Sequence, residues 1–314
     1  MDMDMLNLSG ADSKLYMRFE KAWHRAAQGM GIWGDRAFIL YDTGACAVYD
    51  LVTRNEKPLD VIKLGSYREP EYQGDPYHNH ANDCMFSRTH FEGNPIPLLY
   101  VTIGTGIDRD EDGYYYRCSV ENITCVTDAQ GEHYAAEQIQ TISYIPDGIE
   151  DTKWVQPCWG CPAWLMDPDT DSLYIFSAKY RTKKGCVPEG EKNTYVITRF
   201  NLPKVERGSF IRLTPADILD QFTVDSDVPF TQGGTIYNGK LYYTFGAPQS
   251  IHNYHDIVMV FDLEKKCLVA QVNDMDEALN QEEIECAAPY NGKLLVNTNG
   301  GFGIYTVKED LFLL

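Results

Sequence analysis

The stretch TQGGTIYNGKLYYTFG, residues 231–246, decides the fold. Its Asn238-Gly239 step lies between two segments of alternating pattern, and this dipeptide strongly favours a two-residue β-hairpin turn. A second stretch, ECAAPYNGKLLVNT at residues 285–298, places the same Asn-Gly-Lys-Leu turn six residues after Glu285, just as the first places it six residues after Gln232. The two stretches are therefore copies of one hairpin unit.

Three weaker copies of this unit occur at residues 28–41, 82–101 and 159–176. The leading positions of the five copies are Gln28, Asn82, Trp159, Gln232 and Glu285, separated by 54, 77, 73 and 53 residues. Four strands with their turns need about 40–60 residues, so each interval fits one four-stranded antiparallel sheet. The 27 residues before Gln28 and the 30 residues from Glu285 onward together make a unit of similar length.

This repeat predicts an all-β, five-bladed β-propeller, one domain over residues 1–314, closed by strands shared between the two ends of the chain. A β-sandwich is the alternative, but it gives no reason for turns to recur at a blade-sized period. Residues 46–51, 195–202 and 257–263 fit outer strands. Residues 15–23 fit either a closing strand or a helix, and residues 214–219 and 274–283 predict short helices.

The composition excludes several classes of partner. With 27 Lys and Arg against 46 Asp and Glu, the formal charge is −19, which argues against binding to nucleic acid or to an anionic membrane surface. No apolar stretch reaches the length of a membrane span. The acidic start lacks the features of a signal peptide, and nine scattered Cys fit reduced thiols. We expect a cytoplasmic monomer, or alternatively an exported protein whose leader has been removed.

The segment Phe230-Thr231-Gln232-Gly233, with its Asn-Gly hairpin and Leu241-Tyr242, resembles the blade motif of plant and bacterial glutaminyl cyclotransferases. Ala27-Gln28-Gly29-Met30 is similar to the same motif, and His80-Ala81-Asn82-Asp83 resembles a step in uncharacterised bacterial propeller proteins. The resemblance implies a five-bladed propeller. It does not carry over the cyclotransferase reaction, because no catalytic Glu and Lys set matches residue by residue.

In a propeller, the starts of the inner strands surround one end of the central channel. The leading residues are therefore expected to converge there, and amides, a carboxylate and an aromatic face suit a small polar ligand such as a glycan or a peptide end. The predicted ligand-binding residues are His24, Gln28, Asn82, Trp159 and Gln232. Alternatively, these groups only satisfy one another and ordered channel water.

The segment Tyr77 to Cys84 contains the His78-Asn79-His80 pattern, whose two imidazoles point to one side of an extended strand. Such a pair can bind zinc or another divalent metal with Asp83 or Glu285, can supply a general base, or can be purely structural. The predicted catalytic residues are His78, His80, Asp83 and Glu285. A divalent metal is a possible cofactor, with no ligand set assigned.

Two other motifs have simpler structural interpretations. Cys158-Trp159-Gly160-Cys161 lacks both a βαβ context and a second Cys pair, so packing near the channel is expected. Asp108 to Gly113 starts like a calcium loop, but its twelfth position is Ser119, which favours an Asp-Gly hairpin. Three functions follow for the chain: a binder of a small polar ligand, a cyclotransferase-like or carbohydrate-cleaving enzyme at the same site, or a protein-binding scaffold.

Overall fold

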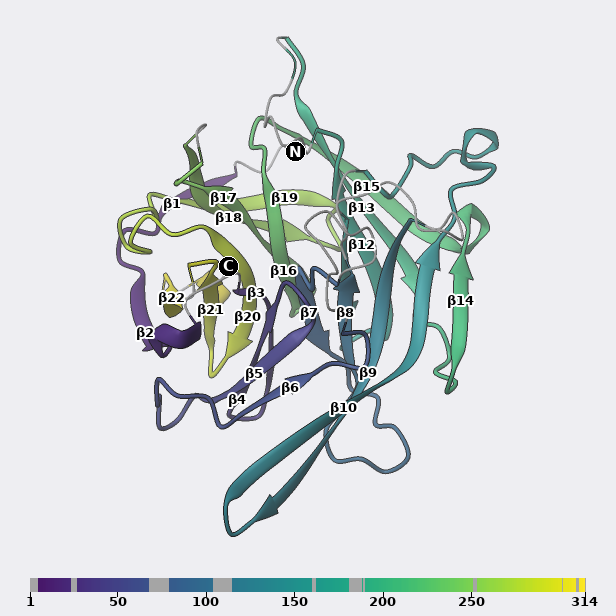
Figure 1. Ribbon diagram of the computed structural model, residues 1–314. Helices are drawn as coiled ribbons and strands as arrows, with labels where there is room; N and C mark the ends of the chain where they lie inside the picture. Colours follow the sequence, from purple (N-terminus) through teal and green to yellow (C-terminus); the bar gives the residue numbers. More distant parts are fainter. Residues whose placement is uncertain are drawn as a thin grey trace.

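The computed structural model describes residues 5–23, 27–67, 79–103, 115–159, 162–180, 188, 190–250, 253–300, 302–308 and 311–313. Strands dominate this part of the chain (Figure 1). Its helical elements are short 3-10 turns: η1 (Lys21–Trp23), η2 (Ile149–Asp151), η3 (Pro215–Asp217) and η4 (Leu311–Leu313). None of the described helices is long and apolar enough to cross a membrane.

Three sheets are built from strands that follow one another closely along the chain. Blade 1 consists of β3 (Ala27–Trp33), β4 (Arg36–Tyr41), β5 (Ala45–Asp50) and β6 (Asp60–Lys63). Blade 3 consists of β11 (Ala163–Asp167), β12 (Ser172–Ala178), β13 (Asn193–Asn201) and β15 (Ile218–Ser226). Blade 4 consists of β16 (Thr231–Tyr237), β17 (Lys240–Ala247), β18 (Tyr254–Asp262) and β19 (Cys267–Asn273), with β1 (Leu6–Ser9) added parallel to β19.

Blades 2 and 5, like blade 4 with its β1, take their outermost strand from a distant part of the chain. Blade 2 consists of β7 (Asp83–Phe86), β8 (Leu99–Ile103), β9 (Tyr115–Asp128) and β10 (Gly131–Tyr144), with β14 (Ser209–Leu213) parallel to β10. Blade 5 consists of β20 (Ile284–Tyr290), β21 (Lys293–Thr298), β22 (Gly303–Val307) and β2 (Lys14–Arg18). Because β2 pairs antiparallel with β22, the last sheet joins the two ends of the chain, and the predicted closure is confirmed.

The inner strands form a closed ring, in which β3 contacts β7, β7 contacts β11, β11 contacts β16, β16 contacts β20, and β20 contacts β3. This ring excludes the β-sandwich and confirms the five-bladed propeller. Large buried side chains fill the spaces between sheets. Phe176 of blade 3, for example, stacks on Tyr243 of blade 4 with 3.8 Å between ring centroids, and burying one such aromatic contributes roughly 1.5–3 kcal/mol.

The turns repeat in conformation as well as in sequence. Asn238 and Gly239 have φ of 50° and 70°, and Asn291 and Gly292 have φ of 46° and 73°, as a two-residue hairpin of the expected type requires. A second repeated contact joins the third strand of a blade to its first hairpin. In that contact the Leu51, Leu202 and Leu263 amides donate to Asp35, Asp171 and Gly239 carbonyls, respectively.

The predicted helix at residues 274–283 is wrong, because the chain forms consecutive turns there. Asn280 and Gln281 adopt φ of 56° and 59°, which a helix does not allow. The Asp276 side chain is also used elsewhere, since its Oδ1 accepts from the Asp256 amide at 2.7 Å. In the segment at 214–219 the helix is limited to the short η3, which begins with a capping box between Thr214 and Asp217, and β15 starts at Ile218.

The β9–β10 hairpin extends well beyond the other blades (Figure 1). Arg36 of blade 1 holds this extension through two hydrogen bonds to Glu132, at 2.9 and 2.7 Å. The buried Glu121 carboxylate accepts the Gly65 and Ser66 amides at 2.8 and 3.0 Å. The hairpin therefore ties blade 2 to the outer edge of blade 1.

Candidate functional site

Three inner strands carry an irregularity at the same place, close to their first residue. The register shifts between Ala27 and Met30 in β3, between Thr231 and Gly234 in β16, and between Ile284 and Ala287 in β20. The residues inside these irregularities are Gln28-Gly29, Gln232-Gly233 and Glu285-Cys286. A β-bulge re-aims side chains and interrupts the ladder, so the leading polar residues are freed from their own sheets at one end of the channel.

Each bulge leaves a backbone N–H that the structure satisfies in a defined way. The Gly233 amide donates to Thr244 Oγ1 at 3.1 Å, and the Cys286 amide donates to Asn297 Oδ1 at 3.2 Å, from equivalent positions of the second strand. Blade 1 has Leu40 at that position, and there the Gly29 amide donates to the Ala81 carbonyl of blade 2 at 2.9 Å. The bulges are thus fully integrated into the fold, as buried polar groups must be.

Gln28 and Glu285 meet although 257 residues separate them. Gln28 Nε2 lies 3.5 Å from Glu285 Oε1, and Asn299 Nδ2 donates to the same oxygen at 2.7 Å. Asn297 Nδ2 donates to the Gln28 carbonyl at 2.8 Å. Gln28 and Glu285 are both buried, with 4% and 2% exposure, whereas Asn299 is partly exposed. Blades 1 and 5 therefore join at a carboxylate surrounded by amides.

Gln232 occupies a more open position next to this group. Its Nε2 donates to the Glu283 carboxylate at 2.6 Å and to the Gly246 carbonyl at 2.9 Å. Both Gln232 and Glu283 are partly exposed. A Cβ at Gly233 would lie 3.2 Å from the Asn82 and Glu285 carbonyl oxygens. The starts of β16, β7 and β20 therefore approach one another closely, and a side chain at Gly233 would crowd them.

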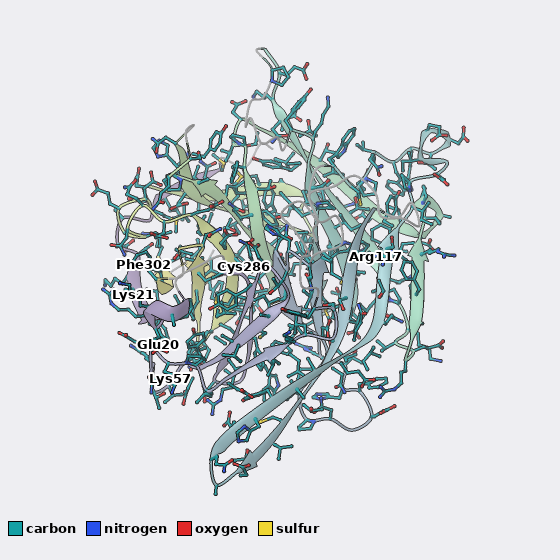
Figure 2. All side chains as sticks on the ribbon, in the orientation of Figure 1. Glu20, Lys21, Lys57, Arg117, Cys286 and Phe302 are labelled. Atoms are coloured by element: carbon teal, nitrogen blue, oxygen red, sulfur yellow. The ribbon has the colours of Figure 1, made fainter. Side chains whose placement is uncertain are left out.

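Asp83 lies deeper in the channel and links three blades. Its Oδ2 accepts the Gly234 amide at 3.0 Å, and its Oδ1 lies 2.9 Å from Cys286 Sγ. Asp83 and Cys286 are fully buried, and Figure 2 shows Cys286 near the middle of the molecule. Burial raises the pKa of Asp83 to about 7 despite the hydrogen bonds that favour its charged form. The pKa of the Cys286 thiol is raised well above its usual value by the same burial, so this thiol is unreactive.

The other predicted residues are placed separately. His80 Nδ1 lies 2.7 Å from Asp42 Oδ1 at a partly exposed position. Asp83 bonds inside the channel instead, so the structure does not bring these two predicted catalytic residues together. Asn82 is 8% exposed directly before β7. Trp159 is partly exposed, and its buried indole nitrogen has no hydrogen-bond partner among the described residues.

Several predictions lie outside the described residues. His24, His78 and Cys161 are among them, as are residues 108–113 of the Asp-Gly hairpin. In the part of the chain that the structure describes, no three His, Cys, Asp or Glu side chains form a group that can hold a metal ion. The possible divalent metal site at His78 and His80 therefore stays a prediction.

Sequence reasoning missed an acidic group beside Gln232. Asp256 is fully buried, its Oδ1 accepts the Ile284 amide at 3.2 Å, and its Oδ2 has no hydrogen-bond partner among the described residues. Burial first, and the nearby Asp276, Glu283 and Glu282 next, raise the pKa of Asp256 to about 8. The run Glu282-Glu283-Ile284-Glu285 in the sequence indicates this concentration of acid, but nothing local connects it to Asp256.

Comparison with known proteins finds similarity in structure but little in sequence. No protein-family model matches it, and no curated protein matches it. The solved glutaminyl cyclase of Myxococcus xanthus is similar, with a TM-score of 0.50 and 10% identity over 97% of this chain and 98% of that one. The β-propeller domain of Myceliophteria thermophila Cps50 (Swd1) gives a TM-score of 0.44 and 11% identity over 94% of this chain and 100% of that one. The resemblance to glutaminyl cyclotransferases is therefore confirmed for the propeller fold, and for the fold alone.

Proposed function

We propose that this protein binds a small polar ligand, a glycan or a peptide end, at the channel end where the inner strands begin. The observation that carries the proposal is the set of bulges that turns Gln28, Gln232 and Glu285 out of their sheets toward the same end. Bulges are over-represented next to binding sites because they re-aim side chains. A shared ligand site would explain why three blades carry a bulge at the equivalent position.

The charge of this end favours the free amino end of a peptide over a neutral glycan. Glu282, Glu283 and Glu285 follow one another around the start of β20, and Glu282, Glu283 and Asp276 lie near the buried Asp256. A carboxylate accepts a charge-assisted hydrogen bond from an ammonium group, which is stronger than a bond between neutral groups. The Gln28 and Asn299 amides fix the orientation of the Glu285 carboxylate, and the partly exposed Gln232 and Glu283 form the approach to it.

The direct test compares three probes in thermal unfolding: a tripeptide with a free amino end, the same tripeptide N-acetylated, and a neutral disaccharide. A ligand at 100 times its dissociation constant adds about 2.7 kcal/mol of stability. We expect the free-amine tripeptide to raise the melting temperature and its acetylated form to have little effect. Stabilisation by the disaccharide alone would mean that the ligand is a glycan and not a peptide end. An unchanged melting temperature with all three probes would contradict the proposal.

Two variants assign the effect to this end of the channel. Glu285→Gln keeps the size of the side chain and removes its charge, and it is expected to weaken binding of the free-amine tripeptide about tenfold or more. Glu277→Gln is the matched control, because Glu277 is exposed in the turn segment that leads to β20. Equal losses in both variants would show that only the overall negative charge attracts the peptide.

The enzymatic alternative is tested in the same experiment. Incubation with a peptide that begins with glutamine, followed by measurement of released ammonia, detects the cyclisation suggested by the name of the Myxococcus enzyme. We expect binding without turnover, because Asp83 and Cys286 are sealed inside the channel and Asp83 does not meet His80. Ammonia release that is lost in Glu285→Gln would instead make this end an active site.

A further inference from the structure

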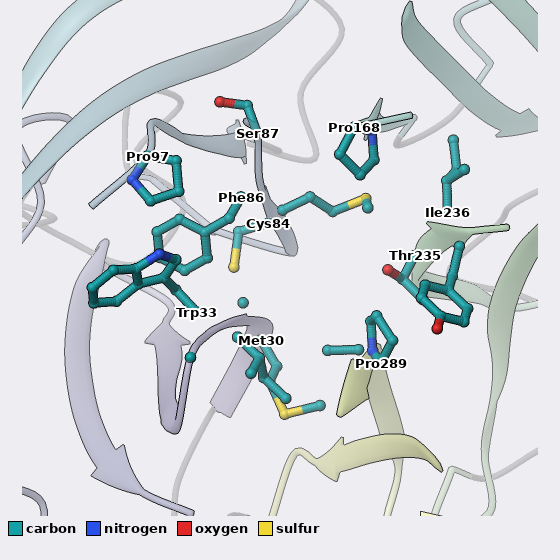
Figure 3. Close-up of a pocket in the computed structure, with 16 residues that line it drawn as sticks. Met30, Trp33, Cys84, Phe86, Ser87, Pro97, Pro168, Thr235, Ile236 and Pro289 are labelled. Carbon is teal, nitrogen blue, oxygen red and sulfur yellow. The ribbon is translucent and has the colours of Figure 1, made fainter. Parts of the chain in front are cut away.

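The opposite end of the channel contains a pocket of about 240 Å³ (Figure 3). It lies at the far ends of the inner strands, and residues of all five blades line it. Its walls include Met30 and Trp33 of β3, Met85 and Phe86 of β7, Ile236 of β16 and Pro289 of β20, with Pro168 directly after β11. The pocket therefore depends on closure of the whole ring.

The chemistry of this pocket is the reverse of that at the polar end. None of the residues that line it is charged. Its lining includes thioethers, aromatic rings and proline rings, and such groups pack favourably on an aromatic ligand. The lining also has polar groups, on Trp33, Ser87, Thr235 and Tyr237, and the Thr235 hydroxyl points toward the middle of the pocket in Figure 3. The Ser87 hydroxyl is already used by Thr89, whose amide donates to it at 3.1 Å.

The two ends of the channel are separated from each other. Asp83 and Cys286 fill the channel between them, and both side chains are completely buried. Cys84 is 1% exposed and lines the apolar pocket from the next position of β7. A molecule in this pocket therefore does not reach Glu285 or Gln28, and the pocket is not part of the polar site.

We infer that the apolar end of the channel binds a small, uncharged aromatic molecule with one polar group directed at Thr235. An engineered apolar cavity of about 150 Å³ stays dry and takes up benzene, so a pocket of 240 Å³ has room for a substituted ring. The absence of charge in the lining disfavours an ionised ligand, because a buried charge needs a partner. Thr235 supplies the hydrogen bond that orients the ring.

The test uses 4-fluorophenol as the probe and follows its binding to the full chain by fluorine NMR. Fluorobenzene lacks the hydroxyl, and 4-fluorobenzoate adds a charge. We expect 4-fluorophenol to bind, fluorobenzene to bind more weakly, and 4-fluorobenzoate not to compete. Binding of 4-fluorobenzoate as strong as that of 4-fluorophenol, or no binding of the phenol, would overturn the inference.

Two variants locate the probe. Ala288→Leu adds bulk at a position that lines the pocket and is expected to weaken 4-fluorophenol binding about tenfold or more, whereas Ala135→Leu, at an exposed position of the β9–β10 hairpin, leaves it unchanged. Thr235→Val keeps the shape of the side chain. It is expected to weaken binding of 4-fluorophenol by about threefold to tenfold and to leave fluorobenzene unaffected.

The Thr235→Val comparison also covers the case in which Ala288→Leu fails to fold, because an isosteric change at one hydroxyl preserves packing. Equal affinities of 4-fluorophenol for the wild type and for a folded Ala288→Leu protein would contradict the assignment. Equal losses for 4-fluorophenol and fluorobenzene in Thr235→Val would contradict the role of the Thr235 hydroxyl.

Discussion

The two ends of the central channel are made by the same five strands and differ completely in chemistry. Where the inner strands begin, bulges release Gln28, Gln232 and Glu285, and amides and carboxylates bond across blades. Where the same strands end, the ladders are regular, and Met30, Trp33 and Phe86 surround an apolar pocket. A local change of backbone register thus gives one repeated unit two ends of different chemistry.

The comparison also shows where the fold is tightly constrained. At the polar end, a Cβ on Gly29 would lie 2.9 Å from the Ala81 carbonyl oxygen, and Gly233 is similarly confined by backbone atoms of two blades. At the apolar end, Gly34 in the hairpin that follows β3 has no atom within 4 Å of such a Cβ. Gly29 and Gly233 are therefore expected to tolerate a side chain poorly, and Gly34 to tolerate one better.

The largest expected effect concerns pH and Asp83. Its pKa is about 7 in the folded protein and 3.8 ordinarily, so between these values the folded state holds a proton that the unfolded state lacks. Stability from this group is fully present below pH 3.8 and is lost as the pH rises through 7. Between pH 5 and 7 the wild type should lose roughly 2–3 kcal/mol more than Asp83→Asn, at about 1.4 kcal/mol per pH unit.

Urea unfolding of both proteins at a series of pH values measures this difference. Asp256, whose pKa is raised to about 8, is unchanged in the two proteins and cancels in the comparison. Parallel stability curves for the wild type and Asp83→Asn would mean that the Asp83 carboxyl is not held in a buried, desolvated position.

The second effect compares glycines at the two ends. Gly29→Ala forces a methyl group against the backbone of blade 2 and is expected to lower the free energy of unfolding by about 2–3 kcal/mol. In Gly34→Ala the methyl group meets no neighbour. The free energy of unfolding falls only because alanine disfavours the positive φ of 56°, by about 1 kcal/mol. Denaturant titration measures both values. A Gly34→Ala protein less stable than Gly29→Ala would reverse the proposed difference in packing.

The third effect compares two threonine hydroxyls. Thr244 Oγ1 accepts the Gly233 amide at 3.1 Å and lies 2.7 Å from the Gly233 carbonyl, so Thr244→Val leaves buried groups unsatisfied and should cost roughly 1–2 kcal/mol. Thr235 is buried beside the apolar pocket, and Thr235→Val, which keeps the shape of the side chain, should cost less than about 1 kcal/mol. Thermal unfolding of the two variants measures the contrast, and equal losses would contradict it.

The smallest expected effect is the coupling between the two ends. Because the buried Asp83 and Cys286 separate them, saturation with 4-fluorophenol should change the affinity for the free-amine tripeptide by less than about twofold. Calorimetric titration of the tripeptide with and without 4-fluorophenol gives this value. A tenfold change would show that the two ligands share a site or that the channel rearranges.

The sequence predicted the fold because its most informative residues act locally. Asn238-Gly239 and Asn291-Gly292 specify hairpins by their own φ values, and their recurrence reveals the blades. The spacing of Leu15 and Met17 is compatible with either a strand or a helix. Their pairing with β22 shows that the segment is a strand. The helix predicted at 274–283 failed because Asp276 serves a tertiary contact with Asp256 that no local pattern reveals.

The site was predictable only in part. The leading positions Gln28 and Glu285 do meet, since a repeat fixes equivalent positions around an axis. Asp83 is buried against Cys286 because blades 2 and 5 both face the channel at this level, and no short stretch of sequence encodes how separate blades are placed. The bulges lie within single blades, and the apolar pocket forms only where all five blades meet. His80 seemed to belong with Asp83 because they are neighbours in sequence, but the backbone turns them to different partners.

The most direct test of the proposed binding site is a crystal structure of this protein with the free-amine tripeptide bound. We expect the peptide at the end of the channel where the inner strands begin, with its amino nitrogen within hydrogen-bond distance of the Glu285 or Glu283 carboxylate. A peptide bound in the pocket beside Trp33 and Phe86, or on the outer faces of the blades, would contradict it.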